Sequence, residues 1–161
     1  MELDRLDARL LDLMQRNNRL SSEELGAKIG LSASGVQRRL KRLRSEHVIE
    51  ADVSIVSPKA IGRNVTVLVL ISLERDRPDI IDRFKRAIGK MPEVMSGFYV
   101  TGQTDFVLLV TANNMEEYEC FTRRLKHENS DLKRVETMVV LDRVKASFSL
   151  PMASIACWCH A

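Results

Sequence analysis

Apolar side chains near the N-terminus recur with the period of amphipathic helices. Leucine and methionine positions predict a first helix over residues 4–16, with Asp4 placed to cap its N-terminus. A second, short helix is predicted from Ser22 to Ile29, because a serine starts it and two glutamates occupy its first turn. Gly30 follows in the position of a left-handed C-cap.

A third helix is predicted after the turn Leu31–Ser34, and its two sides differ in character. Val36, Leu40 and Leu43 form an apolar stripe that faces a core. Five of the eight residues from Gln37 to Arg44 are Arg or Lys, and none is acidic. Two helices joined by a turn of about four residues are the layout of a helix-turn-helix motif.

The basic side of this third helix is the candidate DNA interface. Such a surface attracts a phosphate backbone, and Arg, Gln and Ser also hydrogen-bond to base edges. A run of charges alone is equally typical of a solvated helix face, but the preceding helix and turn favour double-stranded DNA as partner. Gln37 and Arg38 are expected to reach bases, and Lys41 and Arg42 phosphates. The candidate DNA-binding residues are Ser32, Ser34, Gln37, Arg38, Arg39, Lys41 and Arg42.

Beyond the third helix the apolar period changes. Residues Val48–Val56 alternate apolar and polar side chains over much of their length, which predicts a strand or small wing. Pro58–Asn64 contains Pro and Gly and is predicted to be a hinge. A winged helix-turn-helix domain is therefore expected over 1–57, followed by a hinge over 58–64.

The second half of the chain predicts strand, helix, strand, strand, helix and strand. This βαββαβ order is the ferredoxin-like arrangement, in which two helices cover one face of an antiparallel sheet, so the fold class is α+β. The domain is expected over 65–150. The predicted elements are a strand over Val65–Leu73, a helix from Pro78 to about Lys90, strands over Val94–Thr101 and Asp105–Ala112, a helix marked by Met115–Leu125, and a last strand within Val135–Phe148.

The other face of this sheet is expected to be apolar as well. Such a face needs a second cover, and a symmetry-related copy is the simplest source. The alternative is that these side chains are merely exposed. The residues assigned to this face are Leu68, Leu70, Val107, Leu109, Val139 and Leu141.

The composition of the 161 residues is that of a soluble globular protein, with 45% hydrophobic and 29% charged residues. A net charge of +3 is too small to prove a nucleic-acid partner by itself. The charged N-terminus is no signal peptide, and no apolar run reaches the ~18 residues of a membrane span. Three cysteines without framework spacing indicate a reducing, cytoplasmic location.

Motifs for other functions are missing. The three histidines are scattered, and no nucleophile elbow, phosphate-binding glycine loop or metalloprotease motif is present, so no enzyme is predicted. The strand signature of RNA-binding βαββαβ modules is also absent. Cys157, Cys159 and His160 lie in a tail over 151–161 and lack a second ligand pair at zinc spacing, so no metal or cofactor is expected.

The segment Leu25-x3-Ile29-Gly30-Leu31-Ser32-x3-Val36-x2-Arg39-Leu40-x2-Leu43-x4-Val48-Ile49 resembles the N-terminal signature of the Lrp/AsnC family of transcription regulators. The second half resembles their amino-acid-binding regulatory (RAM) domain, with its Gly-x-x-Asp loop at Gly102–Asp105 and a Val-x-x-x-Val-Lys segment at Val140–Lys145. One departure is His47, where the family commonly has Gly. The resemblance covers residues 2 to about 150.

This resemblance implies a DNA-binding domain joined to a sheet-paired homodimer, which commonly assembles to an octamer. It implies amino-acid effectors bound between dimers. The effector pocket would use Thr101, Gly102, Gln103, Thr104 and Asp105 of one chain, and Thr137, Met138, Val139 and Val140 from the last strand of a neighbouring chain.

The loop has a physical rationale beside the resemblance. Gly102 permits a positive φ, so that a ligand carboxylate can approach backbone N–H groups, and Asp105 can accept from an α-ammonium group. The alternative is a hairpin loop in which both residues only shape the turn. The predicted function is a DNA-binding transcription regulator that responds to an amino acid. The alternatives are an architectural DNA-wrapping protein without effector and an amino-acid sensor that acts through protein contacts.

Overall fold

The computed structural model describes residues 2–75 and 77–152, which form two compact units. The N-terminal unit comprises residues 1–54 together with the C-terminal segment that begins at Lys145, and the second unit comprises Ile55–Val144. Each unit has its own hydrophobic core. No helix in the described ranges is long and apolar enough to cross a membrane.

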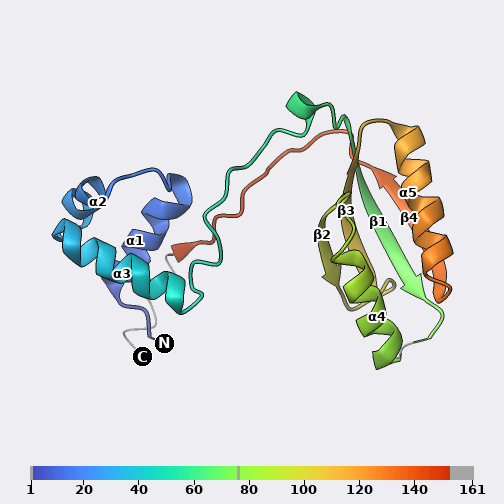
Figure 1. The fold of residues 1–161 in the computed structure, drawn as a ribbon, viewed down its shortest axis with the longest axis horizontal. Coiled ribbons are helices and arrows are strands. Elements are labelled where there is room, and N and C mark those ends of the chain that lie inside the picture. Colours follow the sequence, from blue (N-terminus) through green and yellow to red (C-terminus); the bar gives the residue numbers. More distant parts are fainter. Residues whose placement is uncertain (1, 76, 153–161) are drawn as a thin grey trace. The chain divides into compact units, whose positions relative to one another are not determined.

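The N-terminal unit consists of three helices, α1 (Arg5–Arg16), α2 (Ser22–Ile29) and α3 (Ala33–Ser45) (Figure 1). Each begins at a side-chain cap, because the caps satisfy backbone N–H groups that the first turn leaves free. Asp4 and Ser21 form capping boxes on α1 and α2, and Ser32 caps α3. The predicted helix-turn-helix is confirmed, including the left-handed Gly30 at the end of α2.

The core of this unit is formed by the apolar residues that the sequence placed on one side of each helix. Leu10, Leu25, Val36 and Leu43 are fully buried. The chain leaves α3 through His47, which is exposed and has a φ of 56°. The cost of that left-handed conformation in a non-glycine residue is offset by the turn, in which Val48 and Ile49 both donate backbone hydrogen bonds to Leu43 and pack on the core.

The strand or wing expected over Val48–Val56 is absent: these residues form no strand in the described chain. Val48 and Ile49 close the end of α3, and no ladder hydrogen bonds follow them. Val53, Ile55 and Val56 are exposed. An alternating pattern makes a strand only when another strand pairs with it, and the described residues supply none here.

The second unit is a four-stranded antiparallel sheet in the order β2-β3-β1-β4, with two helices on one face (Figure 1). This confirms the predicted βαββαβ arrangement. A short 3-10 helix, Lys59–Ile61, precedes it within the expected hinge. The elements are β1 (Val65–Leu73), α4 (Pro78–Ile88), β2 (Val94–Tyr99), β3 (Phe106–Ala112), α5 (Met115–Glu128) and β4 (Leu132–Val139).

Alternation along the strands builds the core between sheet and helices. Val67, Val69 and Ile71 of β1 are fully buried toward α4 and α5. Phe106 of β3 packs edge-on against Phe84 of α4, with ring centroids 4.8 Å apart.

The last strand begins three residues earlier than expected, at Leu132 rather than within Val135–Phe148, because its charged residues conceal the alternation. The register also corrects the assignment of the second sheet face. Met138 pairs with Leu68, whereas Val139 pairs with Val67 and thus points to the helix side. A shift of one residue reverses every side chain of a strand. Leu141 lies beyond the strand and is almost fully exposed.

The C-terminal segment joins the helical unit. Gln15 of α1 accepts a hydrogen bond of 2.6 Å from the backbone N–H of Leu150 and donates one of 3.1 Å to its carbonyl. Met152 packs against the helical core. The tail cluster Cys157, Cys159 and His160 lies outside the described residues.

Candidate DNA interface and effector site

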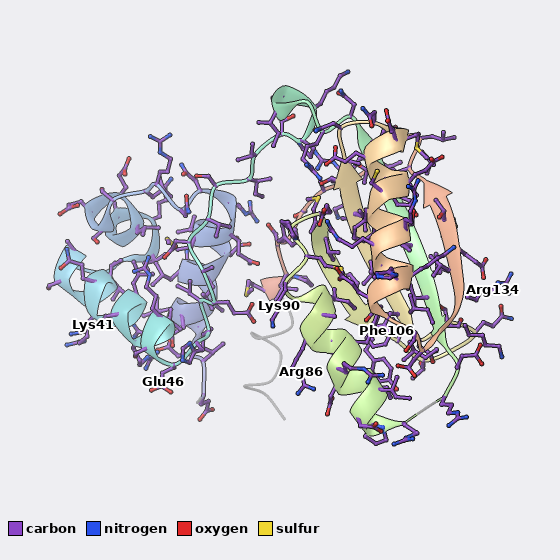
Figure 2. The ribbon with its side chains drawn as sticks, turned by 45° about the vertical axis from the view of Figure 1, so that its right-hand side comes forward. Lys41, Glu46, Arg86, Lys90, Phe106 and Arg134 are labelled. Carbon is purple, nitrogen blue, oxygen red and sulfur yellow. The ribbon has the colours of Figure 1, made fainter. Side chains whose placement is uncertain are left out.

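The exposed side of α3 carries most of the predicted DNA-binding residues. Ser32 Oγ accepts from the backbone N–H of Gly35 at 3.2 Å and lies 3.2 Å from Ser34 Oγ, so both hydroxyls stay at the helix N-terminus. Gln37, Arg38 and Lys41 are exposed, and Figure 2 shows Lys41 pointing away from the helices. Among the described residues, Arg38 and Lys41 form no ion pair.

Two predicted DNA-binding residues form ion pairs with carboxylates at the N-terminus of α1. Arg39 Nη1 lies 2.7 Å from Asp7 Oδ1 and 2.7 Å from Asp4 Oδ2. Arg42 Nη2 lies 2.5 Å from Asp7 Oδ2. Hydrogen bonds to Asp4 and Asp7 raise the pKa of Arg39. The sequence analysis assigned Asp4 only as a helix cap and did not identify Asp7. Two carboxylates one turn apart can indicate that a basic helix packs against them.

The turn of the motif is closed by a backbone contact. Leu31 N–H donates to the carbonyl of Gly26 at 3.0 Å. A Cβ atom at Gly26 would lie 2.4 Å from the Leu31 carbonyl oxygen, which is closer than real Cβ atoms approach. Gly26 therefore sets how closely the turn passes α2, a role that the sequence analysis did not identify.

The predicted effector loop lies between β2 and β3. Gly102 has a φ of 130°, which confirms the expected positive φ. Thr101, Gly102 and Gln103 are exposed. Thr104 Oγ1 donates to the carbonyl of Ile71 at 2.7 Å, and Asp105 Oδ2 accepts from the backbone N–H of Leu73 at 2.7 Å. One carboxylate oxygen of Asp105 thus holds the end of β1.

The other predicted effector residues run from the middle of the sheet, where Thr137 pairs with Val69, toward the end opposite the loop. Thr137, Met138 and Val139 are exposed on the edge strand β4, and Val140 follows its end. Thr137 Oγ1 lies 2.6 Å from the hydroxyl of Tyr118 on α5. Burial raises the pKa of that phenol, although its hydrogen bond to Thr137 partly opposes the shift.

A single chain does not bring the two groups together. The loop is hydrogen-bonded to Ile71 and Leu73, whereas Val139 pairs with Val67. The four residue steps from Ile71 to Val67 span about 13 Å along the strand. Two surface hollows of this unit, about 510 and 420 Å³, are lined by other residues of α4, α5, β2 and the loop after α4 and by Phe106 of β3, and include neither group.

Together these features define a helix-turn-helix regulator with a separate ligand-binding domain. The AsnC-type helix-turn-helix domain matches residues 3–44, and the Lrp/AsnC ligand binding domain matches residues 66–150. The chain belongs to the Lrp/AsnC family of DNA-binding transcriptional regulators.

Relatives support the assignment over nearly the whole chain. The HTH-type transcriptional regulator y4tD of Sinorhizobium fredii is 64% identical over 94% of this chain and 90% of its own length. The glutamate uptake regulatory protein of Zymomonas mobilis is 30% identical over 94% of this chain and 92% of its own. The crystal structure of the transcriptional regulator NMB0573 from Neisseria meningitidis, in complex with L-Met, has a TM-score of 0.88 and 28% identity. The match covers 95% of this chain and 99% of the NMB0573 chain.

Proposed function

We propose that the protein regulates transcription by sequence-specific binding to duplex DNA through α3, and that an amino acid bound to the second unit changes its DNA binding or its assembly. The observation that carries the DNA part is the exposed row of α3, where Arg38 and Lys41 have no ion-pair partner among the described residues. Ser32, Ser34 and Gln37 extend this row toward the helix N-terminus, where side chains reach base edges.

The effector site is proposed at the loop Thr101–Asp105. Gly102 opens the backbone to a ligand carboxylate, and Asp105 Oδ1 remains for the ligand ammonium after Oδ2 accepts from Leu73. The complex of NMB0573 with L-Met makes an amino acid the first ligand to test. Met138, from another chain, would contact an apolar or medium-sized ligand side chain.

The pocket requires a second chain, because one chain places Val139 and Val140 at the end of the sheet opposite the loop. The face of the sheet away from the helices offers a dimer interface. Its side chains are half-buried or exposed in the single chain and largely apolar: Leu68, Leu70, Phe98, Val107, Leu109 and Met138. We propose a homodimer through this face and assembly of dimers, to an octamer, around the effector. Binding at such a junction couples occupancy to assembly.

Duplex DNA as the partner implies action in the cytoplasm. The proposal assigns no catalytic step to this chain. Without an effector response, the protein would be an architectural DNA-wrapping protein. Without DNA binding, it would be an amino-acid sensor acting through protein contacts.

Binding to DNA selected from a random pool tests the interface. Arg38→Ala is expected to cost about 1–3 kcal/mol on the selected site. Lys41→Ala is expected to weaken binding to all DNA sequences alike and to reduce the slope of log affinity against log salt by about one unit. If both variants bind as the wild type does, α3 is not the interface.

A screen of the twenty amino acids tests the effector. One or a few of them should raise the melting temperature at millimolar concentration and change oligomer size or DNA affinity. If none does so while DNA binding persists, the architectural function replaces the regulatory one.

A further inference from the structure

The Asp7 carboxylate is buried beneath α3, the helix proposed to contact DNA. Its side chain is 1% exposed, yet it accepts three hydrogen bonds. Oδ1 accepts from Arg39, and Oδ2 accepts from Arg42 and, at 3.2 Å, from the backbone N–H of Asp4. A buried carboxylate is stable only when it is paired in this way.

The pairing divides the cations of α3 into two groups. Arg39 is held by Asp7 and Asp4, Arg42 by Asp7, and Arg44 by Asp52, whose Oδ2 lies 2.9 Å from Arg44 Nε. Arg38 and Lys41 have no ion pair among the described residues and are one turn apart on the exposed side. The sequence shows a uniformly basic helix, whereas the folded unit presents a row of two uncompensated cations.

We propose that Asp7 is a specificity-determining residue of the DNA interface: it binds Arg39 and Arg42 in the place of a phosphate and withholds both from DNA. This proposal rests on the proposed function. Cations that are free to contact any phosphate increase affinity for all sequences alike. By pairing with two of them, one shared with Asp4, Asp7 leaves a larger share of the binding energy to the residues that reach bases.

The salt dependence of DNA binding measures this division. Each phosphate that a cation neutralises contributes about 0.9 to the slope of log affinity against log salt. If Arg39 and Arg42 are withheld, the wild-type slope contains no contribution from them. Removing the charge of Asp7 while keeping its shape releases Arg42, whereas Arg39 keeps its ion pair with Asp4.

The first experiment compares Asp7→Asn with Asp12→Asn in the full-length protein. Asp12 is also on α1 and, in the part of the chain that the structure describes, forms its one ion pair with Arg16, 3.0 Å away, so the control loses the same charge away from α3. The DNAs are poly(dI-dC) and a duplex selected from a random pool by the wild type. Asp7→Asn is expected to steepen the slope on poly(dI-dC) by about one unit and to lower the ratio of specific to non-specific affinity. Asp12→Asn should leave both as in the wild type.

A purely structural role for Asp7 gives another result. Both affinities would then fall together with the melting temperature, and the slope would not steepen. That outcome, or an Asp7→Asn variant with the wild-type slope and ratio, would overturn the proposal.

A second pair of variants does not depend on the folding of Asp7→Asn. Lys41→Gln and Arg42→Gln each remove one of two adjacent exposed cations. In both variants Asp7 keeps its ion pair with Arg39. Lys41→Gln should flatten the slope by about one unit, and Arg42→Gln should leave it unchanged. Equal flattening would show that Arg42 contacts DNA and would contradict the proposal. Absence of DNA binding by the wild type would instead reject the proposed function itself.

Discussion

Asp105 Oδ2 accepts a hydrogen bond of 2.7 Å from the backbone N–H of Leu73. The backbone N–H of Asp105 in turn donates to the carbonyl of Ile71 at 2.8 Å. The residue that the resemblance assigns to the effector therefore also fastens the loop to the end of β1. Any test of its ligand role has to separate the charge of the carboxylate from this structural hydrogen bond.

Two substitutions of Asp105 make that separation. Asp105→Asn keeps an acceptor for Leu73 but loses the charge, so it should retain the wild-type melting temperature and lose the amino-acid response. Asp105→Ala should lose the response and also about 1 kcal/mol of stability, because it leaves a backbone donor unpaired. Melting curves with and without the amino acid measure both effects. An Asp105→Asn variant that responds as the wild type does would place the pocket elsewhere.

Gly26→Val should destabilise the helix-turn-helix unit by about 1–3 kcal/mol, because its Cβ cannot lie 2.4 Å from the carbonyl oxygen of Leu31. Chemical unfolding monitored by circular dichroism measures the loss. Gly89→Val is the control, because its Cβ would meet its nearest atom, the Lys85 carbonyl oxygen, at an ordinary 3.5 Å. Equal stability of both variants would mean that the turn has room for a side chain.

The stability of the second unit should decrease in acid through Glu93. Burial alone would raise the pKa of Glu93, but its hydrogen bond to Arg124, 2.6 Å away, lowers the pKa below the usual 4.5. A lowered folded-state pKa stabilises the protein above pH 4.5, and this contribution is lost as the pH falls through the folded value. Melting temperatures from pH 7 to pH 2.5 measure the effect. Glu93→Gln should reduce the acid dependence, and an unchanged profile would show that the ion pair contributes nothing.

Leu68→Asp should convert the assembled protein to monomers. In the proposed dimer the carboxylate would be buried without a partner, which costs several kcal/mol. Light scattering at micromolar concentration measures the mass. Arg123→Asp, on the exposed side of α5, is the control and should leave the mass unchanged. A wild type that is itself a folded monomer would contradict the proposed interface.

The sequence by itself determined the local structure. Apolar positions at helical spacing predicted α1, α2 and α3, since such stripes must be buried whatever the rest of the chain does. Gly30 and Gly102 adopt the positive φ expected of them, because only glycine takes it without strain. The alternation along β1 likewise placed Val67 and Leu68 on opposite faces of the sheet.

The tertiary structure decided whatever depends on a distant partner. Val48–Val56 alternates as a strand does, but no strand of residues 2–75 or 77–152 lies beside it. Met138, rather than Val139, lies opposite Leu68, because register is fixed by pairing between strands. Arg38 and Arg39 are the same residue type and adjacent in the sequence, yet Arg39 is bound to Asp7 and Arg38 is exposed. Spacing fixes the direction of a side chain on its own helix, and only the packing of another helix against it determines whether its charge is free.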